Sequence, residues 1–163
     1  MGFDKQELVQ YIEANNWACL ESFGMMTLEI PVQDLVPLMT RLKTNPTCGF
    51  EFLTDLCGIE DVLSQPSRLG VVYHLHNFKD NVRLRVKVYV PHIAPNVPSL
   101  TDLFPCANWM ERETYDFFGI HFEGHPNLVR ILNVDDMVVF PMRKSHPLED
   151  DTRDDKDDSL FGR

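Results

Sequence analysis

The sequence lacks the patterns that mark membrane-spanning, secreted and nucleic-acid-binding proteins. No apolar run approaches the ~20 residues that a transmembrane helix needs. Residues 1–8 show no basic region followed by an apolar stretch, as a secretion signal would. The net charge is −10, whereas binding of nucleic-acid phosphates requires clustered Lys and Arg. We therefore expect a soluble, cytoplasmic protein that does not bind nucleic acid.

Motifs for cofactors and for common catalytic chemistry are also missing. The chain contains no Gly-x-Gly-x-x-Gly, no P-loop and no Gly-x-Ser-x-Gly sequence. It has four cysteines, far apart and without a Cys-x-x-Cys pair, at positions Cys19, Cys48, Cys57 and Cys106. This spacing argues against zinc ribbons and against iron–sulfur clusters bound by this chain alone. We interpret the cysteines as reduced thiols.

What is present is the composition of one ordinary globular domain. The 163 residues are 44% hydrophobic and 25% charged, and a compact chain of this mass hides roughly 70% of its unfolded surface. The acidic residues concentrate at the end, because residues 149–163 contain seven acids and three bases. Such a tail is usually solvated. Its closing segment, residues 159–163, is less polar, and we expect Phe161 to dock on a partner.

Hydrophobic periodicity predicts two helices and four strands in the first part of the chain. One helix begins near Asp4 and ends before Asn15, and another runs from Pro31 to the Asn45-Pro46 stop. The predicted strands cover residues 25–30, 50–56, 70–75 and 82–90. Residues 78–81 suit a hairpin turn between the last two strands. We predict a two-layer α+β domain with a roughly four-stranded, mostly antiparallel sheet packed by helices.

Two further helices are predicted after the prolines of residues 91–98 end the sheet. Ser99 and Asp102 resemble a capping box for a short helix that Pro105 stops. A longer helix covers residues 107–118, and Gly119 suits its left-handed cap. Beyond it, no helical or strand period is sustained. We therefore divide the chain into an α+β body, residues 1–120, and an extended C-terminal arm, residues 121–163, that wraps a partner subunit.

The helix predicted over residues 107–118 carries a mixed face. Met110, Glu113 and Phe117 share one side, so a carboxylate interrupts an apolar stripe and needs a partner if it is buried. Arg112 and Asp116 are four residues apart and could pair with each other. The pattern thus fits either a solvated helix with a few ion pairs or a helix that docks against another subunit.

Two pairs of histidines raise the question of a metal site. His121 and His125 flank Glu123, but Gly124 and Pro126 oppose the continuous helix on which zinc proteases place such residues. We expect structural hydrogen bonds there instead. His74 and His76 share one face of a predicted strand, and no third ligand is evident in the sequence, so we interpret them as surface histidines of a sheet.

A long ordered motif resembles the signature of the C subunit of NADH:quinone oxidoreductase, the respiratory complex I family. It consists of Glu111-Arg112-Glu113-x-Tyr115-Asp116-x-Phe118-Gly119-Ile120, then Phe122-x-Gly124-His125-Pro126-x-Leu128 and Arg130-Ile131-Leu132. Residues 52–56 and 71–75 resemble the sheet of that family, and residues 141–148 resemble its Pro-Leu-Arg-Lys segment. Val129 and residues 137–140 depart from the family pattern.

The resemblance implies a scaffold subunit of the hydrophilic arm, with no active site of its own and no bound flavin, cluster, quinone or metal. It implies packing against the large subunit of the quinone site, on the cytoplasmic side of the bacterial inner membrane. Flavin and iron–sulfur clusters are expected in partner subunits of an enzyme that couples NADH-to-quinone electron transfer to proton translocation. The residues expected at the interface are Trp109, Glu111, Arg112, Glu113, Tyr115, Asp116, Phe118, His125, Arg130, Arg143 and Lys144.

Two alternatives stay open at this point. One is the equivalent scaffold of a membrane-bound hydrogenase, or of a related enzyme with another electron donor, and the genes beside it would separate these cases. The other is a small stand-alone metal-dependent enzyme that uses His121, His125 and the nearby carboxylates. Metal analysis of the purified chain would decide between this enzyme and a scaffold.

Overall fold

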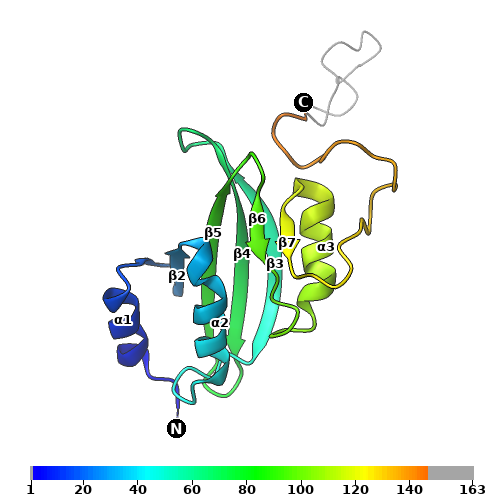
Figure 1. Ribbon diagram of the computed structural model, residues 1–163. Coiled ribbons are helices and arrows are strands. Elements are labelled where there is room, and N and C mark those ends of the chain that lie inside the picture. Colours follow the sequence, from blue (N-terminus) through cyan, green and yellow to red (C-terminus); the bar gives the residue numbers. More distant parts are fainter. Residues whose placement is uncertain (1, 147–163) are drawn as a thin grey trace, which may run out of the picture.

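The structure is a computed structural model that describes residues 2–146 (Figure 1). Its elements are α1 (Lys5–Ala14), β1 (Ala18–Ser22), β2 (Met25–Ile30), the 3-10 helix η1 (Val32–Asp34), α2 (Leu35–Thr44), β3 (Phe52–Asp61), β4 (Arg68–Asn77), β5 (Val82–Pro91), β6 (Asn96–Pro98), α3 (Ala107–Phe118) and β7 (His121–Glu123). The predicted α+β class is confirmed. The acidic end and the closing segment with Phe161 lie outside the described residues.

The main sheet has five strands in the order β1-β2-β5-β4-β3, one strand more than predicted. Strands β3, β4 and β5 are successively antiparallel, β2 runs parallel to β5, and β1 pairs antiparallel with β2. The missed strand β1 is short and largely exposed, so no buried face gives it a period-2 signal. Its position follows from the tight connection at Phe23 and Gly24.

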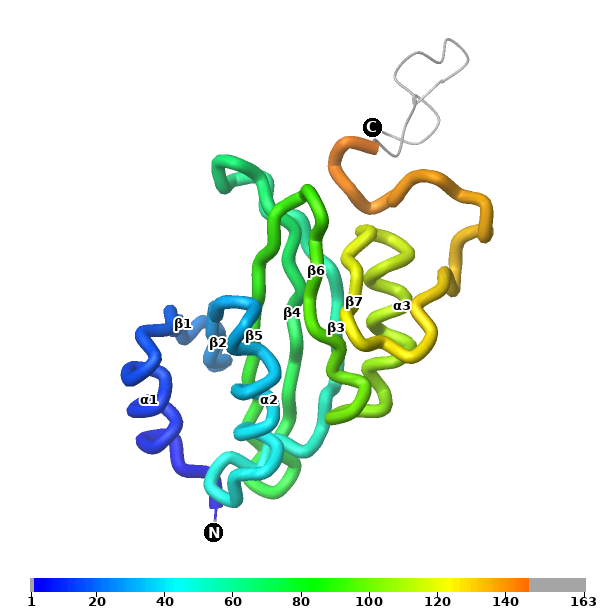
Figure 2. Tube along the Cα trace, viewed as in Figure 1, coloured from blue at the N-terminus to red at the C-terminus, as the bar shows by residue number. Residues whose placement is uncertain are grey.

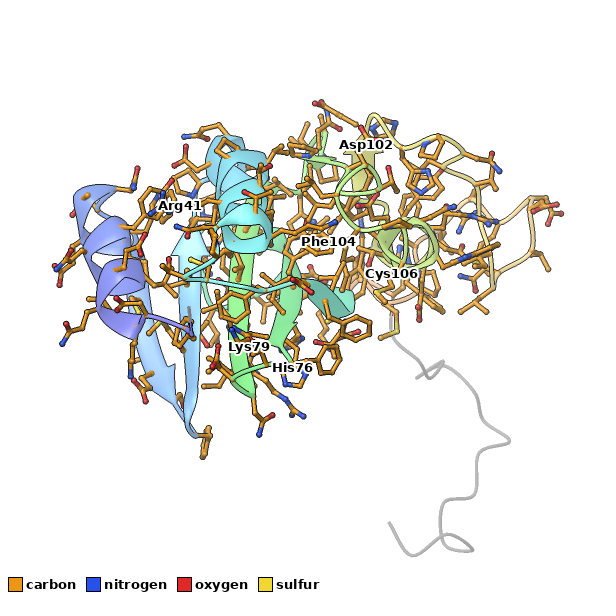
Figure 3. The ribbon with its side chains drawn as sticks, turned by 90° about the horizontal axis from the view of Figure 1, so that it is seen from below. Arg41, His76, Lys79, Asp102, Phe104 and Cys106 are labelled. Carbon is orange, nitrogen blue, oxygen red and sulfur yellow. The ribbon has the colours of Figure 1, made fainter. Side chains whose placement is uncertain are left out.

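One face of this sheet is covered by helices and holds the core. Strand β5 buries Leu84, Val86 and Val88 on that face and turns Arg83, Arg85 and Lys87 to the other, as its alternation predicts. The buried residues of the described chain form a core cluster that joins the sheet to α1, α2 and α3. In Figure 3, Arg41 of α2 lies on the helix side of the sheet and His76 on the opposite side.

The two N-terminal helices follow their sequence signals. The Asp4 side chain accepts hydrogen bonds from the backbone N–H groups of Gln6 and Glu7, as an N-cap residue does. Helix α2 buries Leu35, Leu38, Met39 and Leu42 along one stripe. The helical spacing of these apolar side chains places the helix against the sheet, because the alternative is to leave them in water.

The prediction of a short helix after Ser99 is wrong. Residues 101–103 form a turn, in which the Phe104 N–H donates to the Leu100 carbonyl oxygen at 2.7 Å. The Ser99 hydroxyl donates to the Glu111 carboxylate at 2.6 Å, and Pro105 prevents continuation of the turn. A capping-box sequence thus joins two elements of the fold instead of starting a helix.

After Gly119 the chain returns along its own body (Figure 2). Strand β7 pairs in parallel with β6 as a separate two-stranded sheet. Farther on, the Met142 N–H donates to the Phe117 carbonyl oxygen at 3.2 Å, and the Lys144 N–H donates to the Glu60 carboxylate of β3 at 2.6 Å. The described part of the C-terminal segment is therefore fastened to the body. The division at residue 120 and the wrapping of a partner stay predictions.

Gly119 closes α3 in a left-handed conformation, with φ of 68°, and a Cβ atom there would lie 2.4 Å from the Phe140 ring. Gly124 has a similar φ of 84°, but a Cβ atom there would meet nothing within 4 Å among the described residues. We expect Gly124→Ala to cost roughly 1 kcal/mol of unfolding free energy for its backbone alone. Gly119→Ala should cost at least twice as much, measured by urea unfolding. Equal losses would show that the ring contact is unimportant.

Candidate functional site

The site built by the signature motif is α3 together with the segment that returns along it, residues 124–146. Helix α3 turns Ala107, Glu111 and Thr114 inward, at the i, i+4 and i+7 positions of one face. Gly119 ends the helix, and its N–H donates to the Tyr115 carbonyl oxygen at 2.8 Å. The carboxylate expected to interrupt the buried face was Glu113. Glu113 is exposed, and the buried carboxylates are those of Glu111 and Asp116.

Glu111 links α3 to the loop that precedes it. Its side chain is 0% exposed and accepts hydrogen bonds from the Leu100 N–H at 2.7 Å and from the Ser99 hydroxyl at 2.6 Å. Burial raises the pKa of Glu111 to about 7, although both hydrogen bonds favour the charged form. The fully buried Tyr73 is close enough for the Glu111 charge to add to the effect of burial and raise the Tyr73 pKa further. The Tyr73 hydroxyl has no hydrogen-bond partner in residues 2–146.

Asp116 fastens the returning segment to α3. Its side chain is also 0% exposed, but its Oδ2 atom accepts three consecutive backbone N–H groups, from Ile131 at 3.1 Å, Leu132 at 2.8 Å and Asn133 at 2.9 Å. Its Oδ1 atom accepts from Arg130 at 2.7 Å and from the Asn133 amide at 3.0 Å. Burial by itself raises the pKa of Asp116, but these donors outweigh it and hold the pKa well below its usual range.

Arg130 closes the loop formed by residues 131–139. The same Nη1 atom that binds the Asp116 carboxylate also donates to the Asp116 carbonyl oxygen at 3.0 Å. The Nη2 atom donates to the carbonyl oxygens of Met137 at 2.6 Å and Val139 at 3.2 Å. The guanidinium lies 5.2 Å from the centre of the Phe140 ring. One side chain therefore ties three points of the returning segment to the end of α3.

Arg112 and Arg143 make two further attachments. Arg112 donates to the carbonyl oxygens of Val129 at 3.1 Å and Arg130 at 3.0 Å, and its guanidinium lies 5.1 Å from the Trp109 ring centre. The ion pair between Arg112 and Asp116 that their spacing allows is therefore not formed. Arg143 donates to the Phe118 carbonyl oxygen at 2.7 Å. Both arginines thus hold backbone carbonyl groups of the chain itself.

The residues expected at a partner interface fall into three groups by exposure. The exposed ones are Trp109, Glu113 and Lys144, the fully buried ones are Glu111 and Asp116, and the partly buried ones are Arg112, Tyr115, Phe118, His125, Arg130 and Arg143. The two buried carboxylates make their contacts within the chain. A contact of any of these residues with a partner stays a prediction.

Sequence reasoning missed the exposed apolar side chains of the returning segment. Leu132 is 64% exposed, and other exposed apolar side chains of the same stretch are Val129, Val134, Val138, Val139 and Met142. Trp109 on α3 is 60% exposed. We call Trp109 and these six side chains the α3 apolar surface. A signal was present, because Val129 and residues 137–140 are the apolar departures from the family pattern.

The His125 side chain of the motif makes hydrogen bonds within the chain. His125 Nε2 lies 3.1 Å from the Asn108 carbonyl oxygen, and Nδ1 accepts from the Asn127 N–H at 3.0 Å, so Nε2 carries the proton. Within residues 2–146, no group of three or more His, Cys, Asp or Glu side chains is arranged to hold a metal ion. In the same range, no helix is long and apolar enough to cross a membrane.

Comparison with protein families and curated proteins gives concordant matches. The family model described as respiratory-chain NADH dehydrogenase, 30 Kd subunit, matches residues 28–152. The C subunit of NADH-quinone oxidoreductase from Methylobacterium radiotolerans is 43% identical over 127 residues, covering 78% of this chain and 58% of that protein. The protein of the same name from Herpetosiphon aurantiacus is 45% identical over 125 residues, covering 77% of this chain and 72% of that protein. The chain thus spans little more than half the length of the Methylobacterium relative.

Solved structures support the same assignment of the fold. A trypsin-resistant fragment of Nqo5 (residues 1–134) is 35% identical with a TM-score of 0.66, and the match covers 76% of this chain and 98% of the fragment. A chain of the membrane-bound sulfane sulfur reductase, an archaeal respiratory membrane complex, has a TM-score of 0.74 at 22% identity, over 88% and 85% of the two chains. At that identity the second match is evidence for the fold alone.

The raised pKa of Glu111 predicts a specific pH dependence of stability. The unfolded carboxyl ionises near its ordinary pKa of 4.5 and the folded one near 7, so between these values the folded state binds more protons. Stability should therefore fall as pH rises from about 4.5 to 7, by at most roughly 3–4 kcal/mol. Glu111→Gln should remove this component of urea-unfolding free energy, whereas Glu113→Gln, at an exposed position of the same helix, should keep it. An unchanged pH slope in the Glu111 variant would contradict the assignment.

Asp116 predicts the opposite pH dependence. Because its folded pKa is depressed, its stabilisation is complete above the unfolded value of 3.8 and is lost as pH falls below it. At neutral pH, Asp116→Ala should cost about 3–5 kcal/mol, because Arg130 then keeps its burial without its carboxylate. Limited proteolysis should cut first within residues 130–139. Asp102→Ala, at an exposed position, serves as the control, and equal protease resistance of the two variants would refute the role of Asp116.

Proposed function

Because the chain belongs to the family of the 30 Kd subunit of respiratory-chain NADH dehydrogenase, we propose that it acts as a non-catalytic scaffold within an NADH:quinone oxidoreductase. In this role it would bind a neighbouring subunit through α3 and the segment that returns along it. The electron transfer from NADH to quinone, and the proton translocation coupled to it, would take place in other subunits of the assembly.

The observation that carries this proposal is how the signature residues are used. The most deeply buried charged groups of the motif, Glu111 and Asp116, accept hydrogen bonds from the chain itself. They therefore fix backbone and do not point into a pocket where a substrate could reach them. What they fix is a rigid support for exposed apolar side chains, including Trp109 and Leu132. A rigid surface with an exposed aromatic residue beside an arginine has the composition of an interface core.

The proposed partner is the large subunit that helps to form the quinone site. This choice rests on the family, as does the proposed position on the cytoplasmic side of the inner membrane. The same family implies that flavin and iron–sulfur clusters belong to the partners. Charged residues around the α3 apolar surface, such as Glu113 and Lys144, are exposed and available for pairing at its rim. Rim charges of this kind direct association more than they add affinity.

Purification of the tagged full-length chain from membranes of its own host, with its partners identified by mass, tests the proposal. Recovery of a large quinone-site subunit and of the flavin-and-cluster subunits that oxidise NADH is the expected result. A partner with nickel-binding cysteines would instead indicate a hydrogenase, and recovery of the chain alone would contradict a scaffold role.

Trp109 provides a sharper test, since it is 60% exposed and its removal opens no cavity in the core. We expect Trp109→Ala to leave the unfolding free energy within about 1 kcal/mol of the wild type. It should nevertheless lower the affinity for the partner by roughly 30-fold, which corresponds to ~2 kcal/mol for an aromatic anchor. The readout is the yield of partner subunits with the tagged chain. Phe23→Ala, which removes a fully exposed aromatic residue at the β1–β2 turn, is the control. Equal yields from the two variants would refute the proposed surface.

A further inference from the structure

The sheet face opposite the helices carries a row of basic side chains. Arg83, Arg85 and Lys87 alternate along β5 and stand on this face, with one residue of the core face between each pair. At ~3.3 Å per residue, successive charges in the row are about 7 Å apart. We call these three residues the β5 basic row. It is a local positive surface on a chain whose net charge is −10.

The acids on the same face already have partners. Glu29 lies beside Lys87 in the strand register, but its carboxylate pairs with Arg68 at 3.1 Å. Asp61 also pairs with Arg68, at 3.0 Å. Arg68 thus takes up two of the carboxylates that the β5 basic row would otherwise attract.

The third acid, Asp55, is joined to the row only through a histidine. His74 lies 3.2 Å from the Asp55 carboxylate through Nδ1, and its Nε2 accepts from the Arg85 Nε–H at 2.8 Å. The His74 ring thus stands between the Asp55 carboxylate and Arg85, and an imidazole ring offers Arg85 no negative charge. Within residues 2–146, no carboxylate lies within ion-pair distance of Arg83, Arg85 or Lys87.

The chain itself supplies a complementary segment, residues 149–158, which contains seven acids and two bases. The described chain comes close to this row at Lys144, whose N–H binds Glu60 near the end of β3, on the face that the helices cover. By strand register, Glu60 aligns with Val90, two strands away, and Lys87 lies three residues from Val90. This places Lys87 about 14 Å and Arg83 about 25 Å from Glu60. From Lys144, an extended chain spans ~17 Å over the five residues to position 149 and ~47 Å over the fourteen residues to position 158. The segment is therefore long enough to pass around the edge strand β3 and reach the row.

From this charge complementarity and reach, we propose that the acidic segment 149–158 of the same chain binds the β5 basic row. Each exposed ion pair contributes little by itself. Tethering makes the association intramolecular, with an effective concentration in the millimolar range, so several weak pairs act together. The contact is electrostatic and at the surface, so added salt must weaken it. The proposed contact does not depend on the proposed scaffold function, so an experiment that refutes one of these proposals does not refute the other.

Zero-length carbodiimide cross-linking of the full-length chain, followed by peptide mass spectrometry, tests the contact. Lys87 should become linked to an acid of residues 149–158, and at least fivefold less so in 0.5 M NaCl than in 20 mM. The exposed pair of Lys5 and Glu21, 2.8 Å apart, provides an internal reference for the reaction. Mixing of isotopically light and heavy protein distinguishes links within one molecule from links between two.

A matched pair of variants separates the specific contact from net charge. Asp154→Asn with Asp155→Asn should lower the yield of the Lys87 link at least twofold relative to the reference. Asp135→Asn with Asp136→Asn changes the net charge by the same amount at exposed positions of the described chain and should leave the yield unchanged. Equal effects of the two variants, links only between molecules, or equal linking of the tail to Lys5 and Lys87 would each overturn the proposal.

A second readout does not depend on cross-linking chemistry. In a chain that ends after Leu148, the backbone amide resonances of residues 83–87 should shift relative to the full-length protein at low salt, and the difference should vanish in 0.5 M NaCl. The truncation leaves residues 2–146 intact, so resonances of α1 and α2 are the control for folding. Unchanged resonances along β5 at low salt would overturn the proposal.

Discussion

The hydrogen bonds to the buried Asp116 carboxylate determine how the signature segment is arranged. A carboxylate removed from water costs several kcal/mol unless donors replace the lost hydration. Helix α3 cannot supply those donors, because its interior N–H groups are used within the helix. The chain supplies them from residues 130–133, whose N–H groups and arginine converge on the two oxygen atoms. The segment must therefore turn back, and the left-handed Gly119 lets it do so directly after the helix.

Two carboxylates of one helix, both without exposed surface, have opposite pKa shifts because Glu111 lies deeper and has fewer donors than Asp116. Glu111 receives two hydrogen bonds, and neither comes from a charged group, so burial prevails and its pKa rises. Asp116 receives three backbone N–H groups, an amide and a guanidinium, so the charged form prevails. The pKa of the first group thus lies near neutral pH, whereas the pKa of the second is held well below its usual range.

Sequence periodicity located the sheet and the helices where the signal was local. The alternation along β5, the apolar stripe of α2 and the glycine that ends α3 each depend on residues close in the chain, and they appear in the structure as predicted. Strand β1 gave no signal, because it is exposed and is defined by its pairing. The hydrogen-bond partner of Ser99 is Glu111, twelve residues away. Residues close to Ser99 in the chain do not reveal this partner, and they predict a helix cap instead. The predicted inward face of α3 was also wrong, because polar side chains such as Glu111 face the core and their partners lie outside the helix.

From the sequence, the charges of the motif are expected to meet another protein, but the best-defined contacts of these charges lie within the chain. This distinction matters for the proposed scaffold function. Charges that hold backbone, as Arg112 and Arg130 do, leave a rigid surface whose exposed groups are largely apolar. Binding of a partner to such a surface would lose little conformational entropy, because the chain itself already holds the segment in place. In the proposed scaffold, the buried charges would thus contribute to partner binding indirectly, by fixing the positions of side chains such as Leu132 that carry no charge.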